Sequence, residues 1–203
     1  MRKVAISNGT TVVAIDPGVR LHGWCSVLCC EYPDDVRLFN QSEGYSETTN
    51  IEDVLWDING SGVEYIVAVE TPAGHAYSAA RVKYLLSTAV NAGRFCGLAD
   101  AVGARVVECS AETWRESLTG SPSANDDKIE AALLVAVKSG LLNSMPHSVL
   151  KGDLPHIRDA TGLALVVATR GVDWVEAREA ERRGQTKRQE TLPGLGTKRR
   201  TKR

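Results

Sequence analysis

The first part of the chain carries apolar and β-branched residues in short runs that predict β-strands. Residues 11–16, TVVAID, are typical of a buried strand. Residues 22–29 predict a second strand, reached through a turn that contains Pro17 and Gly18, and residues 36–40 predict a third. Three consecutive strands with short connections predict an antiparallel meander at the start of the fold.

The rest of the chain alternates between helical and strand patterns. The pattern predicts helices at 51–59, 77–102, 126–138 and 155–176, and strands at 65–70 and 105–109. SAET, which begins at Ser110, is a helix N-cap pattern, and Pro155 suits the first turn of a helix. Strands followed by alternating helices and strands predict an α/β fold with a mixed sheet flanked by helices.

Charge is distributed unevenly along the 203 residues, although the net charge is only −1. Residues 178–203 contain ten Lys/Arg and three Glu, a net +7, which leaves −8 for residues 1–177. We therefore expect one globular domain, 1–177, and a disordered basic tail, 178–203. Such a tail suits a polyanionic partner such as nucleic acid, or equally a solvated tail that maintains solubility.

Several protein classes are disfavoured by the sequence. No apolar run approaches the length of about 18 residues that a membrane span needs, and the N-terminus lacks a secretory signal pattern, so we expect a cytoplasmic protein. The five cysteines contain no CxxC pair, which argues against a disulfide framework or a structural zinc site. We expect most of them to be buried as small apolar residues.

Two of the predicted strands end on an acidic residue, Asp16 in one and Glu70 in the other. Asp-Pro-Gly is also good turn chemistry, so Asp16 alone could simply start a turn. If the two strands are neighbours, however, both carboxylates reach the same place and repel each other. A divalent cation such as Mg²⁺, which prefers oxygen ligands, would then stabilise the pair.

A third group of candidate ligands lies at the start of the last predicted helix. His156 and Asp159 are three residues apart and therefore lie on the same face. A helix that packs on the sheet through its apolar side would bring both residues near the strand ends. An acid at a helix start also stabilises the helix dipole, and a histidine there is often a surface residue, so the set as a whole carries the argument.

These stretches resemble the RuvC-type Holliday-junction resolvase family of the ribonuclease H-like superfamily. The matching stretches are AIDPGVRLHGW, IVAVETP and LPHIRDATGLALVVATR, in the family's order and spacing, so that the resemblance covers about residues 11–172. It implies a ribonuclease H-like mixed five-stranded sheet and a crossover junction endodeoxyribonuclease. It also implies a bacterial or phage origin.

The resemblance implies a site of four residues, Asp16, Glu70, His156 and Asp159, around two Mg²⁺ ions, with Mn²⁺ as a substitute. The family's equivalents of the three acids hold the metals, and His156 would touch a metal, position the attacking water or assist the leaving group. The implied reaction is hydrolysis of a DNA phosphodiester to a 5′-phosphate and a 3′-hydroxyl. Paired symmetric nicks would resolve a four-way junction.

The chain departs from the family pattern around the expected DNA contacts. The position of the aromatic wedge offers only His75 and Tyr77, Val19 stands where a small polar residue is common, and the loop GSPSANDDK is longer and more acidic. The expected DNA-binding residues are Arg20, Tyr77, Arg81, Lys83, Arg115 and Lys128. Taken singly, each of the basic residues is better explained as a solvated surface charge.

Predicted partners follow from the same features. The resemblance implies a homodimer through helix 77–102, where Ala89, Gly93 and Gly97 form a stripe of small residues; the stripe also suits packing against the chain's own sheet. The segment QETLPGL, 189–195, is a weak match to sliding-clamp peptides.

Three alternatives to a junction-specific resolvase have to be weighed. A broader nuclease of forks and flaps would share most of these features and stays open. A non-catalytic DNA-binding protein is disfavoured by the intact set Asp16, Glu70, His156 and Asp159. An ATP-binding fold of the actin and sugar-kinase type needs a second domain, for which 203 residues leave no room.

Overall fold

The computed structural model describes residues 4–20, 22–32, 35–46, 55, 64–72, 79–145 and 155–191. The elements in chain order are β1 (Thr11–Asp16), β2 (His22–Tyr32), β3 (Asp35–Ser46), β4 (Tyr65–Thr71), α2 (Ala79–Ala101), β5 (Arg105–Ser110), α3 (Ala111–Thr119), α4 (Asp126–Lys138), α6 (Pro155–Arg170) and α7 (Val172–Thr191). Of the predicted helix 51–59, only Leu55 is described; it is helical and buried. In the described part of the chain, no helix is both long enough and apolar enough to cross a membrane.

The strands form one mixed five-stranded sheet in the order β3-β2-β1-β4-β5. β1, β2 and β3 pair antiparallel, which confirms the predicted meander, and β4 and β5 join β1 in parallel. β1 and β4 are therefore direct neighbours, with Ile15 opposite Val69. All six residues of β1 are buried, as expected for a central strand covered on both faces.

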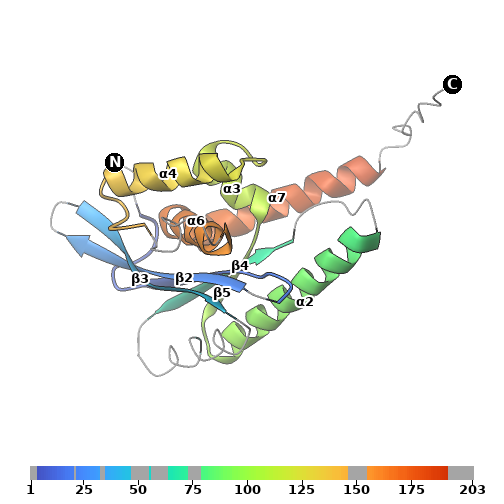
Figure 1. The fold of residues 1–203 in the computed structure, drawn as a ribbon, viewed down its shortest axis with the longest axis horizontal. Coiled ribbons are helices and arrows are strands. Elements are labelled where there is room, and N and C mark those ends of the chain that lie inside the picture. The colour runs from blue at the N-terminus through green and yellow to red at the C-terminus, as the bar shows by residue number, and fades with distance from the viewer. Residues whose placement is uncertain are drawn as a thin grey trace.

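Helices cover both faces of the sheet (Figure 1). On one face α2 packs against β4 and β5, and Phe95, Ala92 and Ala99 fill the layer beneath it. On the other face α6 lies across β1 and β2, and α3, α4 and α7 pack around α6. As a result, α6 is buried without interruption from Ile157 to Ala168.

The last helical region differs from the predicted single helix 155–176. Gly171 adopts a φ of 81°, a left-handed conformation that ends α6 and separates it from α7. α7 then continues to Thr191, so the part of the predicted tail from 178 to 191 is helical. The clamp-like segment 189–195 crosses the end of the described residues, and residues 192–203 lie outside them.

All five cysteines are free thiols. Cys25, Cys29 and Cys109 are buried, whereas Cys30 and Cys96 are half-buried. This agrees with the expectation that most of them behave as small apolar residues.

Candidate metal centre

Three acidic side chains from separate parts of the sequence meet at one edge of the sheet. Asp16 is the last residue of β1, Glu70 lies one residue before the end of β4, and Asp159 lies in α6, near its start. One carboxylate oxygen of each lies within 4.8 Å of those of the other two. Asp16 and Asp159 are 7% and 6% exposed, and Glu70 is partly buried. The structure thus brings together the three acids that the sequence singled out.

Glycine lets α6 come close enough to complete this cluster. A Cβ on Gly23, in β2, would lie 2.3 Å from the carbonyl carbon of His156, far inside any real contact. Gly23 pairs with Asp16 across the β1–β2 ladder. The last glycine of the motif Asp-Pro-Gly-x-Arg-x-x-Gly therefore has a steric role, because any side chain there would push the start of α6 away from the strand ends.

The turn that follows Asp16 is fixed from the opposite face of the sheet. Asn91 of α2 donates a hydrogen bond from Nδ2 to the carbonyl oxygen of Gly18, 2.9 Å away, and lies 3.3 Å from that of Val19. A long-range side-chain bond of this kind holds the backbone of the Asp-Pro-Gly turn, and with it the end of β1.

His156 is hydrogen-bonded to Asp16. The Nδ1 atom of His156 lies 2.5 Å from Oδ2 of Asp16. This hydrogen bond raises the pKa of His156, against the opposing effect of burial. His156 therefore carries a proton more readily at this position than a free imidazole does, because the Asp16 carboxylate stabilises the charged ring.

Glu70 is held by the indole of Trp114, which lies in α3. The Nε1–H group of Trp114 donates to Oε2 of Glu70 across 2.8 Å. Trp114 itself is fully buried and packs against Gly162 of α6, where an added Cβ would lie 2.8 Å from the ring. The polar edge of Trp114 is a positioning contact that an apolar pattern in the sequence does not reveal.

Two arginines bind the two oxygens of Asp159. Arg115 donates to Oδ2 over 2.8 Å, and Arg158 donates to Oδ1 from Nε and Nη2 at 3.0 and 2.8 Å. Arg158 is 8% exposed and also reaches Asp126, at the start of α4, over 2.9 Å. Arg115, expected at the DNA surface, thus contacts an acid of the cluster, and Arg158 joins the cluster to the acidic loop region.

The electrostatics of Glu70 and Asp16 are dominated by burial. Burial raises the pKa of Glu70 well above its usual range, and the nearby Asp16 and Asp159 raise it further. Burial also raises the pKa of Asp16, although the hydrogen bond from His156 opposes this. Ionising both groups is therefore costly unless further positive charge arrives between them.

The donor set fits a divalent metal ion. All three ligands are carboxylates, the ligand type that Mg²⁺ and Mn²⁺ prefer. Among the described residues, the hydrogen bonds of Asp16 and Glu70 use Oδ2 and Oε2, so that Oδ1 and Oε1 remain for a metal. Asp16, Glu70 and Asp159 would hold the ion. His156 is not one of these three ligands, and its predicted contact with a metal stays a prediction.

Comparison with known proteins gives structural matches alone. No protein-family model matches the chain, and no curated protein sequence matches it. The structure of Thermus thermophilus RuvC matches 84% of this chain and 96% of its own at a TM-score of 0.52 and 21% identity. T. thermophilus RuvC in complex with a Holliday junction substrate matches at 0.53 and 20% identity, with 80% and 95% coverage.

The fold is similar to that of RuvC. A yeast mitochondrial Holliday junction resolvase also matches, at a TM-score of 0.45 and 11% identity over 92% of this chain and 88% of its own. The RuvC matches confirm the expected α/β class and the mixed five-stranded sheet with its flanking helices.

The remaining predicted DNA contacts lie at scattered places. Arg20 is exposed just beyond the Asp-Pro-Gly turn, Lys83 is exposed in α2, and Lys128 is exposed in the first turn of α4. Arg81 belongs to α2, but the structure does not describe its side chain. His75 and Tyr77 lie outside the described residues altogether. The wedge position therefore stays a prediction.

The small residues of α2 divide between its two sides. Ala92 and Ala99 are buried beneath the helix with Phe95. Ala89, Gly93 and Gly97 are exposed, and a Cβ on either glycine would meet nothing within 4 Å. Packing against the chain's own sheet therefore explains the first group and leaves the second without a contact among the described residues.

Proposed function

We propose that the chain is a metal-dependent, structure-selective DNA endonuclease that resolves four-way junctions by paired nicks. The convergence of Asp16, Glu70 and Asp159, with ligand atoms within 4.8 Å of one another, carries this proposal. The likeness to RuvC, whose solved complex contains a Holliday junction substrate, supports the choice of DNA substrate. The three acids are also those expected from the sequence motifs.

The residues of the chain have separate tasks in this reaction. Asp16, Glu70 and Asp159 would hold two divalent ions, which would activate a water and stabilise the leaving 3′-oxygen. Trp114 and Arg158 orient Glu70 and Asp159 through the bonds described above. In this proposal His156 orients the attacking water; its hydrogen bond to Asp16 supports a position beside the acids. The products are a 5′-phosphate and a 3′-hydroxyl.

The test uses purified protein, Mg²⁺ and end-labelled DNAs: a four-way junction, a fork, a flap, a linear duplex and a single strand. We expect symmetric paired nicks on the junction, and none with Asp16→Asn, which keeps the shape of the side chain but loses a charge. Comparable cutting of forks and flaps would instead indicate a broader branched-DNA nuclease. Turnover by Asp16→Asn at the parent rate would contradict the assignment of the metal centre.

Paired nicking also requires two active sites, and α2 offers a surface for a second copy of the chain. Three large apolar residues on this helix are 41%, 61% and 69% exposed, namely Val82, Leu86 and Val90. They are spaced by four residues and lie beside the exposed small residues of α2. We propose that this side of α2 forms a symmetric dimer interface. Exposure of a surface helix does not by itself require such an interface.

Sedimentation measurements test the dimer. Leu86→Glu places a charge in the proposed interface and is expected to yield monomers that bind DNA but no longer make paired nicks. Val135→Glu is the matched control, because Val135 is 62% exposed on α4, on the other face of the sheet. A monomeric parent protein, or dimerisation unaffected by Leu86→Glu, would contradict the proposed interface.

A further inference from the structure

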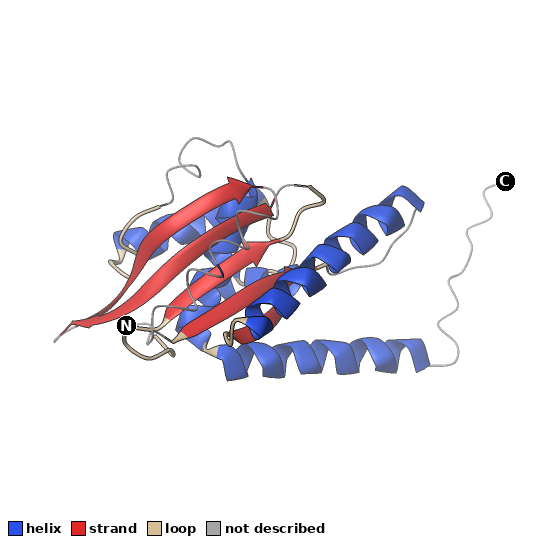
Figure 2. Ribbon diagram, turned by 90° about the horizontal axis from the view of Figure 1, so that it is seen from below, coloured by secondary structure: helices blue, strands red, loops and turns tan. Residues whose placement is uncertain are grey.

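α7 runs alongside β5 and continues past the edge of the sheet that carries the metal centre. Asp173 in its first turn pairs with Arg105 at the start of β5, 2.6 Å away. Glu179 contacts Ser110 at the end of β5. The helix then extends for another twelve residues, to Thr191, which corresponds to about 18 Å at 1.5 Å per residue. Figures 1 and 2 show this end of α7 beyond the sheet, on the side where α2 also projects.

A buried acid, Glu179, fixes the point from which this segment of α7 projects. Glu179 is 8% exposed, and its Oε1 accepts hydrogen bonds from the backbone N–H of Ser110 at 2.9 Å and from its hydroxyl at 2.7 Å. Ser110 is at the same time the N-cap of α3. A buried carboxylate with two donors is a specific anchor, because any other placement would leave it buried without partners.

The same short helix, α3, also holds the metal centre. Its Glu116 binds Arg178 and Arg182 of α7, while its Trp114 and Arg115 bind Glu70 and Asp159. β5 adds a second connection, because Thr71, next to Glu70, pairs with Ser110. The projecting part of α7 is therefore positioned relative to the acids by a few direct contacts, and not by a flexible linker.

The projecting part of α7 is basic once its own ion pairs are subtracted. Glu181 pairs with Arg178, and Arg182 pairs with Glu116. Three further cations follow along the helix, Arg183, Lys187 and Arg188, against the single acid Glu190. Positions 183 and 187 are four residues apart and lie on the same side of the helix.

We propose that residues 182–191 of α7 form a rigid basic arm that binds the phosphate backbone of a duplex arm of the substrate, at a fixed position beyond the metal centre. The inference rests on the proposed function, since it takes branched DNA as the partner. A flexible tail would add affinity for DNA without orienting it. A helix in a fixed position would also orient the duplex relative to the acids. Phosphate contacts of this kind set the register of a protein on DNA and carry no base specificity.

Gly184 permits a test that separates rigidity from charge. A Cβ at this position would meet nothing within 4 Å, so Gly184→Ala is tolerated and favours the helix. Gly184→Pro keeps every charge but breaks the helix at the start of the arm, since proline lacks the N–H and clashes with the preceding turn. A third variant replaces Arg183, Lys187 and Arg188 by Gln and keeps the helix.

All variants carry Asp16→Asn so that the junction is not cut, and the affinity for a labelled four-way junction is measured across a salt series. For the glutamine variant we expect affinity to fall about tenfold at low salt, and the salt dependence to weaken by about 0.9 in log–log slope for each lost contact. For Gly184→Pro we expect a loss of comparable size, whereas Gly184→Ala retains full affinity. Thermal melting checks that the folded body is unchanged.

Four outcomes would overturn the arm, and the last of them would also overturn the proposed function. Equal affinity of Gly184→Pro and Gly184→Ala would show that the charges act as a flexible tail. An unchanged salt slope in the glutamine variant would show that this helix does not contact phosphate. Altered self-association in either variant, with DNA affinity intact, would assign the helix to a protein contact. A parent protein that binds no branched DNA would overturn the proposed function itself, and the arm with it.

Discussion

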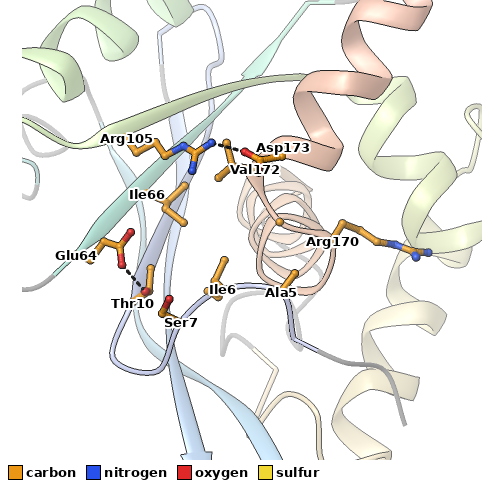
Figure 3. A pocket seen from close by; sticks show the side chains of 11 residues that line it. Ala5, Ile6, Ser7, Thr10, Glu64, Ile66, Arg105, Arg170, Val172 and Asp173 are labelled. Carbon is orange, nitrogen blue, oxygen red and sulfur yellow. Dashed lines mark hydrogen bonds and ion pairs between the residues drawn. The ribbon is translucent and has the colours of Figure 1, made fainter.

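The two ends of the parallel strands carry acids in very different settings. At the end described above, Asp16, Glu70 and Asp159 converge from β1, β4 and α6. At the opposite end lies a cavity of about 230 Å³, lined by the starts of β4, β5 and α7 (Figure 3). There Glu64 accepts a hydrogen bond from Thr10 over 3.2 Å, and Asp173, with a 92% exposed side chain, pairs with Arg105.

The difference lies in convergence and burial, and not in the number of acids. Each acid at the cavity end has a partner of its own and is in contact with water, so neither needs a cation to be stable. The acids at the other end share one small volume, and burial together with mutual repulsion raises the pKa of Glu70 well above its usual range. A cluster that is costly when ionised is where a bound metal has most to stabilise.

The largest effect is expected from removing one charge at each end. Glu70→Gln should reduce the cleavage rate by about 10³-fold or more, because it removes a proposed metal ligand. Glu64→Gln, the same change at the cavity end, should leave the rate within about twofold of the parent, in keeping with a surface position. Single-turnover cleavage of a four-way junction measures the rate of each variant. Equal losses of rate in the two variants would contradict the proposed difference between the two ends of the strands.

The next effect concerns the close approach that builds the cluster. Gly23→Ala should destabilise the fold by about 3 kcal/mol, because its Cβ would overlap the backbone of His156 and displace the start of α6. Gly184→Ala is the control, since its Cβ has open space. Urea unfolding measures the difference, and a Gly23→Ala protein as stable as the parent would mean that α6 does not approach β2 so closely.

A smaller loss is expected from an arginine that positions an acid. Arg158→Gln should reduce cleavage about 10- to 100-fold and raise the Mg²⁺ concentration needed for half-maximal rate, since Asp159 loses a two-point support. Arg158→Lys keeps the charge without the forked geometry and should recover only part of the activity. Arg105→Gln, at the cavity end, should change neither quantity. Normal Mg²⁺ dependence in Arg158→Gln would exclude the positioning role.

The smallest effect is a pH dependence of stability. In the metal-free protein, burial raises the pKa of Glu70 and Asp16, so folding stability is lost as pH rises and these groups ionise in the folded state. The pKa of His156 is also raised, so its contribution is complete below the ordinary value of 6.5 and is lost as pH rises through the folded value. Both effects have the same sign.

Thermal melting between about pH 5 and about pH 8 should therefore show the melting temperature of the metal-free protein falling by a few degrees as pH rises. Mg²⁺ should offset the fall at the upper end, because it binds the ionised carboxylates. Glu70→Gln should flatten the slope, whereas Glu64→Gln should leave it unchanged. A melting temperature that rises with pH in the absence of metal would contradict the assigned burial of the cluster.

Much of the fold followed from local pattern. The meander of β1 to β3, the strand β4 and the helix Asp126–Lys138 lie where the apolar periodicity predicts them, because strand and helix periods are properties of neighbouring residues. The Ser110 cap was also correctly predicted, and its side chain accepts from the N–H of Thr113. The break at Gly171 was missed, because a single glycine inside a helical pattern is compatible with either continuation or termination.

The sequence by itself determined which residues could form the site, since Asp16 and Glu70 each end an apolar strand and Asp159 lies near the start of an apolar helix. Only the tertiary structure decided how they are supported. Trp114, Arg115 and Asn91 reach the site from other elements, over separations in sequence that no local pattern records. The anchoring of α7 by Glu179 belongs to the same class, because the burial of a carboxylate depends on what packs around it and not on its neighbours in sequence.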